Sequence, residues 1–395
     1  MTETLKRRIG PGLLTVYGVG VMVGAGIYVL VGAVVAEAGI WAPLSFLIAG
    51  LIAAPTALSY AEFSTRLPEA AGEAIYVSKG LRRPSLAIVV GLAIVLAGTV
   101  SAAAVLRGGV GYLTSVVDFP FEITVAALGL ALMAVAVVGV LESMVLVAVF
   151  TAVEVIGLAL VIFAGFSVPA TADFTVPPEI IWAGVASAAV LAFFAFIGFE
   201  DIVNMAEEVA TPERTLPRAI LWSLLITSLL YALVSFAAVR AVPLEQLGQS
   251  KQPLALVWST ARGGSASFLA LIAVAAALNG VLAQIVMASR VLFGLGKRTT
   301  MLGVFHHAHP RFGTPVLATV LIGAAVIAGA VALPVADLAE VTSALLLAVF
   351  VMVNAALIAM KRREPEAAFR VPMLVPVVGL SLALAALVLA IGVNI

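Results

Sequence analysis

The stretch GVGVMVGAGIYV, residues 18–29, places glycines at positions 18, 20, 24 and 26 within a long apolar segment. Each glycine costs a helix interior about 1 kcal/mol relative to alanine. Inside a bilayer, an open backbone is tolerated only where it lines a cavity within the protein. The stretch therefore predicts a membrane helix that is interrupted near its middle. A second interpretation is that Gly20 and Gly24, a GxxxG pair, only allow two helices to pack closely.

A second unusual stretch, FFAFIGFED at residues 193–201, runs from apolar residues through one glycine into two acids. Charged groups within a membrane segment are costly and usually face a cavity or a partner inside the protein. This stretch therefore predicts a second interrupted helix. The alternative is that Glu200 and Asp201 already lie near the cytoplasmic end of their segment and are hydrated.

The composition places most of the chain in a membrane. Hydrophobic residues make up 63% of the 395 residues and charged residues 11%, against about 25% charged in a typical soluble domain. The net charge is zero, so nothing suggests a nucleic-acid partner. Because the chain has no cysteine and no visible catalytic triad or phosphate loop, we expect neither an enzyme nor a cofactor. His306, His307 and His309 fit a solvated loop better than a metal site.

Runs of about 20 apolar residues mark membrane helices. The chain has eleven such runs and lacks alternating amphipathic strands, so we predict an all-α polytopic membrane protein with one transmembrane domain over residues 1–395. The predicted spans are 11–37, 41–64, 86–115, 123–141, 143–167, 180–206, 218–240, 264–290, 314–333, 337–360 and 372–393.

Lysine and arginine in the loops predict the orientation. With the N-terminus in the cytoplasm, 17 of the 21 Lys and Arg residues fall inside, 3 fall outside and Arg107 lies within a span. We therefore expect a multi-pass protein of the plasma membrane with a cytoplasmic N-terminus and, after eleven spans, an external C-terminus.

The two interrupted helices begin the first and the sixth span. This spacing of five helices predicts two units of opposite orientation, the arrangement of an inverted-repeat transporter. Repeat one would cover about 11–167 and repeat two about 180–360, and an extra helix would follow at about 372–393.

Two helix breaks can bind a zwitterion. The N-terminus of a half-helix exposes free amides that suit a carboxylate, and its C-terminus exposes carbonyls that suit an ammonium group. We expect the backbone at 24–26 to hold the carboxylate of an amino acid, and carbonyls at 19–20 and 196–197 to hold its amine, with phenylalanines as the pocket wall. The predicted substrate-binding residues are Val19, Gly20, Val23, Gly24, Ala25, Gly26, Ile27, Phe194, Phe196, Ile197, Gly198, Phe199 and Glu200.

Four motifs in order resemble the amino acid–polyamine–organocation transporter superfamily over nearly the whole chain. They are GVMVGAGIY at 20–28, YAE at 60–62 with LP and AGE at 67–73, FIGFE at 196–200 with PERTLPRAI at 212–220, and SRVL at 289–292 with HPRFGTP at 309–315. The resemblance implies a fold of five-plus-five inverted helices, alternating access, and a substrate site at the broken first and sixth helices. The family commonly has twelve helices, and the missing twelfth bears on the contacts of a homodimer.

The fifth span carries an unusual charge. Gly139 and Ser143 match the start of the family's fifth helix, and many relatives place a lysine where this chain has Glu154. At 1.5 Å per residue, Glu154 lies roughly 16 Å into a hydrocarbon core of about 30 Å. It is predicted either to carry a coupling proton or to be a static ion-pair partner of Arg107, with Asn279 at a similar depth.

The leading hypothesis is therefore a secondary transporter of amino acids that is driven by protons or by exchange. Small residues and phenylalanines at the breaks favour neutral amino acids. Sodium would need hydroxyls beside Asn279 in the eighth span, and none is near, so sodium is less favoured. The alternatives are a carrier of polyamines or other organic cations, and an amino acid sensor that does not transport.

Overall fold

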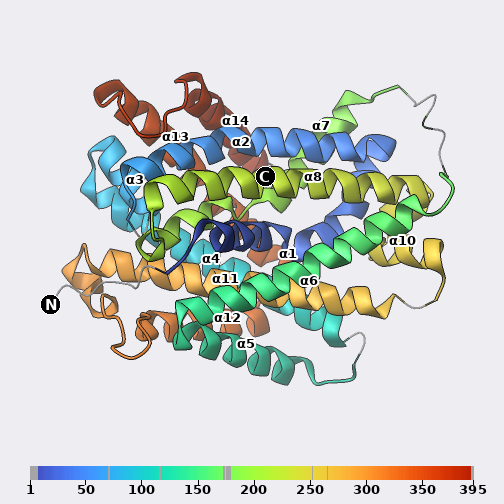
Figure 1. Cartoon of the computed structure of the whole chain (residues 1–395), viewed down its shortest axis with the longest axis horizontal. Helices are drawn as coiled ribbons and strands as arrows, with labels where there is room; N and C mark the ends of the chain where they lie inside the picture. The colour runs from blue at the N-terminus through green and yellow to red at the C-terminus, as the bar shows by residue number, and fades with distance from the viewer. Residues whose placement is uncertain are drawn as a thin grey trace.

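The computed structural model describes residues 8–69, 72–114, 117–171, 174, 179–250, 252–264 and 266–392. Within these residues the chain is helical, and its only extended pairing is one bridge between Ile9 and Val209. Figure 1 shows long helices running roughly side by side, with α3 at one end of the molecule and α10 at the other.

The fourteen α-helices and four short 3-10 helices (η) of the described chain have the following bounds. They are α1 Pro11–Ala38, η1 Gly39–Trp41, α2 Ala42–Arg66, α3 Gly72–Leu81, α4 Pro84–Thr114, α5 Phe121–Val138, α6 Val140–Phe166, α7 Trp182–Phe193, η2 Phe194–Phe196, η3 Phe199–Glu208, α8 Pro212–Ala241, α9 Leu244–Gln249, α10 Pro253–Arg262, α11 Ser267–Gly296, η4 Thr300–Phe305, α12 Val316–Ala332, α13 Val335–Arg363 and α14 Leu374–Gly392.

Each predicted span coincides with helical structure. Among the described residues, eight segments are long and apolar enough to cross a membrane, and Trp182–Phe193, Val316–Ala332 and Leu374–Val388 are shorter apolar helices. The sixth predicted span is α7 followed by η2 and η3 rather than one regular helix. The sequence patterns missed α3, α9 and α10, because these helices have 10, 6 and 10 residues and lie in connections that were expected to be loops.

Large apolar side chains point outward from the long helices. Leu51, Ile123 and Phe163 are exposed by 70%, 66% and 62% of their surface, respectively. A soluble monomer rarely shows apolar surface on this scale, whereas lipid covers it at no cost. The molecule is therefore built to be embedded in a bilayer.

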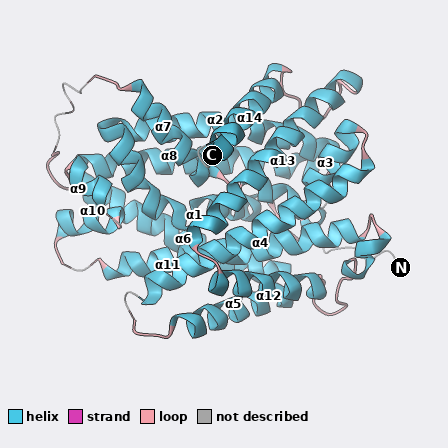
Figure 2. Cartoon of the chain, turned by 180° about the vertical axis from the view of Figure 1, so that it is seen from behind, coloured by secondary structure: helices cyan, strands magenta, loops and turns pink. Residues whose placement is uncertain are grey.

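The helices form two packed groups around α1. In one group, α1, α2, α7 and α8 pack together, with α2 lying along α8 in both views (Figures 1 and 2). In the other group, α4 packs along α11, and α5 and α12 pack against α4. The helix α1 touches both groups through α8 and α11, so its break lies at their junction.

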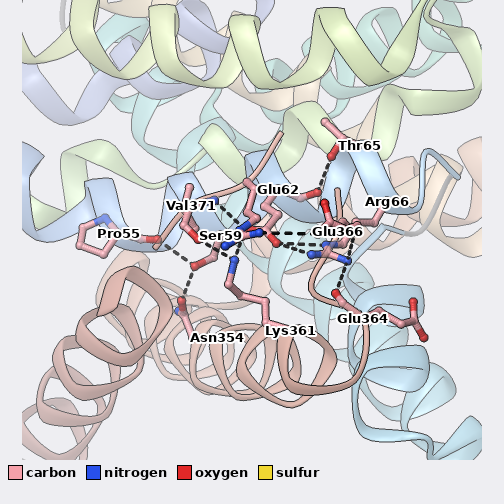
Figure 3. A network of polar contacts seen from close by, with 11 residues as sticks. Pro55, Ser59, Glu62, Thr65, Arg66, Asn354, Lys361, Glu364, Glu366 and Val371 are labelled. Carbon is pink, nitrogen blue, oxygen red and sulfur yellow. Dashed lines mark hydrogen bonds and ion pairs between the residues drawn. The ribbon is translucent and has the colours of Figure 1, made fainter. Parts of the chain in front are cut away.

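A buried ionic network joins α2 to α13 and to the connection before α14 (Figure 3). The Glu62 carboxylate accepts hydrogen bonds from Arg66 Nη2 at 2.6 Å, from Lys361 Nζ at 2.7 Å and from the backbone amide of Val371 at 2.8 Å. The Glu62 side chain is fully buried, and Arg66 and Lys361 are each 6% exposed. Because every charge has a partner, this network is compatible with a buried position.

The same network fastens the α13–α14 connection. Arg66 Nη1 donates to the carbonyls of Glu364 at 2.9 Å and Glu366 at 3.0 Å, and Lys361 Nζ donates to the carbonyl of Val371 at 2.6 Å. One turn away, Ser59 donates to Asn354 Oδ1 at 2.8 Å. These contacts form a clip between α2 and residues 354–371.

Removing the carboxylate of the clip is expected to destabilise the protein strongly. Glu62→Ala leaves two buried cations unpaired, a change that typically costs about 3–5 kcal/mol. We expect a clear drop in the melting temperature of the purified protein in detergent. The matched control is Glu366→Gln, since the Glu366 side chain is 90% exposed and only its backbone carbonyl joins the clip. Equal melting temperatures for the two variants would contradict the role given to Glu62.

Candidate functional site

The backbone of α1 leaves helical geometry at Gly24, where φ is −7° and ψ is −172°. A Cβ atom built on Gly24 meets nothing within 4 Å, and Gly26 is exposed. In contrast, Val23 and Ile27 are fully buried. The helix therefore presents backbone, rather than side chains, to open space at its break. The side chain of Ala25 lies outside the described residues.

Before the break, α1 lies very close to α6 and α11. A Cβ atom at Gly20 would overlap Thr151 Oγ1 of α6 and lie 2.7 Å from Asn279 Nδ2 of α11. The missing side chain brings the Gly20 carbonyl within 3.4 Å of that amide nitrogen. Val19 is 4% exposed. Gly20 therefore serves close packing as well as the polar cluster around it, which combines both interpretations of the glycine pattern.

The second irregular segment follows α7. Gly198 has φ of +127°, a conformation that side chains rarely adopt, and its amide donates to Glu200 Oε2 at 2.9 Å. A Cβ atom at Gly198 would lie 2.8 Å from Val21 Cγ1, so this turn packs directly against α1. Glu200 is 1% exposed, so its carboxylate binds its own turn instead of water.

The other predicted residues of this segment have different surroundings. Phe196 is fully buried and Phe199 is 1% exposed, whereas Ile197 is partly exposed. The side chain of Phe194 lies outside the described residues. Phe199 packs edge-on against Tyr60 at 5.7 Å between ring centroids, which makes it part of the core on the α3 side.

One hydroxyl joins the two irregular segments. Tyr231 Oη of α8 lies 2.6 Å from the carbonyl of Met22 and 3.0 Å from the carbonyl of Ala195. The ring is fully buried and packs against Phe196 at 5.2 Å and Phe46 at 5.7 Å. A hydroxyl has a single hydrogen, so it can fully satisfy only one of the two carbonyls at a time. Tyr231 was not among the predicted site residues. Its position in the middle of an apolar span is the one feature of the sequence that marks it.

Glu154 lies in a polar cluster between α1, α6 and α11. Asn279 Nδ2 donates to Glu154 Oε1 at 2.8 Å and also lies 3.1 Å from Thr151 Oγ1. Tyr28 of α1 donates to the Glu154 carbonyl at 3.3 Å. The Glu154 side chain is fully buried, and its Oε2 atom has no hydrogen-bond partner among the described residues. The expected neighbourhood of Glu154 and Asn279 is thus present.

The ion pair between Glu154 and Arg107, one of the two sequence interpretations, is wrong. Arg107 Nη1 donates instead to the carbonyls of Ala330 at 2.7 Å and Val331 at 3.2 Å at the end of α12, and its guanidinium lies over the ring of Phe121. The similar membrane depths of Glu154 and Arg107 were not enough to predict a contact between them, because Arg107 points to α12.

Two hollows of the described structure are lined by neither Gly24 nor Gly198. One, of about 20 Å³, lies between Tyr28, Tyr112 and Leu269, and the other, of about 650 Å³, lies at the surface between α3, the start of α4 and Lys297. A zwitterion needs unpaired amides and carbonyls, which a helix break supplies.

The helix η3 is held by three contacts on the α3 side. Arg290 of α11 pairs with Glu208 at 3.1 Å. Gln284 of α11 donates to Asp201 at 2.6 Å, and Asn204 donates to Glu73 of α3 at 3.2 Å. Glu73 belongs to the AGE motif, but neither Glu73 nor Gln284 was among the predicted site residues, since the sequence does not show which neighbour a polar side chain will meet.

The alternative of a hydrated cytoplasmic end does not fit the two acids of η3. Glu200 and Asp201 are 1% and 2% exposed. Both carboxyl groups are therefore enclosed where η3 packs against α11 and α3.

Comparison with known proteins identifies the family. The model of the amino acid permease family matches residues 13–394. The branched-chain amino acid permease BcaP of Bacillus subtilis is 28% identical, over 96% of this chain and 87% of that protein. The methylthioribose transporter of the same organism is 30% identical, over 95% and 86%.

A plant relative is considerably longer than this chain. The vacuolar cationic amino acid transporter 4 of Arabidopsis thaliana is 29% identical over 92% of this chain, which covers 64% of that protein. The match to the family model spans both irregular segments and nearly all the helices around them. This chain therefore belongs to the amino acid permease family and is a multi-pass membrane transporter, not an enzyme.

Proposed function

We propose that the protein is a secondary active transporter of amino acids that works by alternating access in the plasma membrane. The observation that carries the proposal is the pair of irregular segments that meet at Tyr231, with free backbone on one side of α1 at Gly24. Where a helix restarts, its first amides have no partner within the helix. Backbone of this kind inside a membrane protein suits a polar ligand.

The substrate's two charged groups have separate places in this geometry. The amides that follow Gly24 suit a carboxylate, since they lie at the start of a half-helix. The carbonyls of Met22 and Ala195 suit an ammonium group, because Tyr231 can satisfy only one of them fully. This proposed position of the ammonium group differs from the carbonyls at 19–20 and 196–197, which the sequence had suggested for it.

We favour a neutral side chain. Among the described residues around the breaks, the polar groups Glu200 and Asp201 are buried and bonded to Gly198 and Gln284, so neither is free to bind a cationic side chain. Gly26 is exposed, and Gly24 and Ile197 are partly exposed. The name of BcaP, a branched-chain amino acid permease, agrees with this preference.

The coupling ion is proposed to be a proton carried by Glu154. A fully buried carboxylate with only amide and hydroxyl groups around it is costly as an anion, so it favours its neutral form. If the cluster of Glu154, Asn279 and Thr151 becomes hydrated when α1 moves, the carboxylate can release its proton. The family's lysine at this position would carry the opposite charge, so its role cannot be transferred.

The orientation remains the one that the basic loops predict. Lys79 lies in the last turn of α3, and Arg82 directly follows that helix. Arg363 donates to the Lys79 carbonyl and Arg298 shares Glu69 with Lys79, so all four bases gather at α3. We place that end of the molecule in the cytoplasm.

Uptake into proteoliposomes is expected for neutral amino acids with branched or other apolar side chains. The panel should include lysine, arginine and methylthioribose, because relatives carry the corresponding names. A pH gradient, acidic outside, is expected to drive accumulation, whereas a sodium gradient is not. The absence of accumulation, exchange and binding for every amino acid would overturn the proposed function.

Tyr231→Phe is expected to weaken substrate handling without unfolding the protein. The variant keeps the ring between Phe46 and Phe196 but leaves buried carbonyls unsatisfied, a loss of about 1–3 kcal/mol, or roughly five- to 150-fold in KM or kcat. The matched control is Tyr17→Phe, because the buried Tyr17 hydroxyl has no hydrogen-bond partner among the described residues. Initial uptake rates over a range of substrate concentrations test the difference, and equal kinetics for both variants would contradict it.

Glu154→Gln is expected to abolish accumulation driven by a pH gradient while substrate exchange persists. Glutamine keeps an acceptor for Asn279 but cannot bind and release a proton. The control is Glu37→Gln at the exposed end of α1. Full pH-driven uptake by Glu154→Gln would rule out Glu154 as the proton carrier.

A further inference from the structure

Glu73, the second residue of α3, lies against η3 in a fully buried position. Asn204 of η3 donates from Nδ2 to Glu73 Oε1 at 3.2 Å, and its Oδ1 accepts the amide of Gly72 at 3.1 Å. A Cβ atom at Gly72 would lie 2.8 Å from Val203 Cγ2, so the backbone of α3 lies directly against the Val203 side chain here. We call this paired contact of Gly72 and Glu73 with Asn204 the latch.

The latch is buried, and several polar atoms in and beside it make no hydrogen bond among the described residues. Glu73 Oε2 and the hydroxyls of Tyr60 and Tyr76 are buried without a hydrogen-bond partner among the described residues. Tyr76 stacks on Phe63 at 4.6 Å, and Tyr60 packs edge-on against Tyr76 at 6.2 Å. The aromatic rings from α2 and α3 thus exclude water from the carboxyl group of Glu73.

The charged neighbours of Glu73 are acids. Burial is the largest cause that raises the pKa of Glu73, and the charge of Glu200 in η3 raises it further. Glu73 in turn interacts electrostatically with Asp201 in η3. Bonds from the α3 backbone and from Asn204 act in the opposite direction. The net result is a pKa of about 8 for Glu73.

The nearest bases are engaged elsewhere. Lys79, at the other end of α3, pairs with Glu69, and Arg363 of α13 donates to the carbonyls of Lys79 and Gly80. The only charged residue of α4 is Arg107, which bonds to α12. Among the described residues, no basic side chain forms an ion pair with Glu73.

A nearby contact of η3 provides the contrast. Arg290 and Glu208 lie at 3.1 Å with both side chains buried, so that contact balances its own charge. The carboxyl group of the latch is bonded by the Asn204 amide and the α3 backbone, and it pairs with no cation among the described residues. A carboxylate in dry surroundings is costly unless a cation or a proton neutralises it.

We infer that Glu73 is a proton-binding site of the inner gate: a bound proton allows η3 to close against α3, and its release into water accompanies opening on that side. This inference rests on the proposed alternating-access function, in which the α3 side must open and close. The proton would be additional to the one assigned to Glu154, which lies in a different cluster between α1, α6 and α11.

The sign of the pH dependence follows from the two environments of Glu73. In the closed latch its pKa is about 8, against 4.5 for a free glutamate side chain. The closed form therefore binds the proton more tightly, and protonation favours closure. Between these two values, each unit of rising pH weakens closure by up to about tenfold.

Thiol labelling tests this inference directly, because the chain has no cysteine. Val203→Cys places a thiol in η3, facing Gly72, at a position that is fully buried while the latch is closed. Its rate of reaction with a maleimide in nanodiscs is measured from pH 5.5 to 8.5 without substrate. The reference is Val304→Cys, at a position in η4 that is 62% exposed. The labelling rate of Val203→Cys is divided by the rate of this reference, which removes the pH dependence that comes from ionisation of the thiol itself.

The expected ratio rises with pH, by up to about tenfold per unit, until about pH 8. Adding Glu73→Gln is expected to remove this slope and keep labelling slow, since glutamine is neutral and still accepts from Asn204. Glu69→Gln is the matched control and should keep the slope, because Glu69 is 35% exposed and paired with Lys79 and Arg298.

An unchanged slope in the Glu73→Gln variant would overturn the inference. If this variant is not recovered as a monodisperse protein, Glu73→Ala removes the same titrating group and should also remove the slope. Labelling needs no transport, so a chain that transports amino acids but shows no slope contradicts only the gate inference. A slope without any transport would instead leave the latch in place and remove the proposed function.

Discussion

Every backbone amide and carbonyl that lies at membrane depth must find a partner inside the protein. The two irregular segments violate regular helix geometry at that depth, so the surrounding helices have to supply partners. Tyr231 supplies a hydroxyl to Met22 and Ala195, Glu200 supplies a carboxylate to Gly198, and Asn279 supplies an amide to Gly20. The packing of α8 and α11 against α1 is thus set by what the breaks require.

Much of the fold was predictable because lipid makes hydropathy a strong signal. All eleven predicted spans coincide with helical structure, and the glycines at 20, 24 and 198 mark where helices meet or turn. The short helices in the connections were not predictable from hydropathy, since their stability comes from packing against the spans.

The candidate site was predictable only in part. Glycine spacing pointed to Gly24, where the backbone leaves helical geometry, and the similar depth of Asn279 suggested a bond to either Glu154 or Arg107, of which the structure has the bond to Glu154. Depth alone also suggested Arg107, which turns toward α12, because the rotation of a helix about its axis is not fixed by hydropathy. Neither Tyr231 nor Glu73 was among the predicted site residues, since a polar residue in a helix gives no hint of which neighbour it will meet.

The clip at Glu62 divides the molecule in a way that the order of the chain does not suggest. Because Glu62 and Arg66 bind an amide and carbonyls of residues 364–371, the connection that leads into α14 is joined to α2 by hydrogen bonds from buried charged groups. A rigid body in a moving transporter is defined by such bonds and not by repeat boundaries. If α2 moves during transport, α14 is therefore expected to move with it as one unit, which makes the moving part wider on its lipid-facing side.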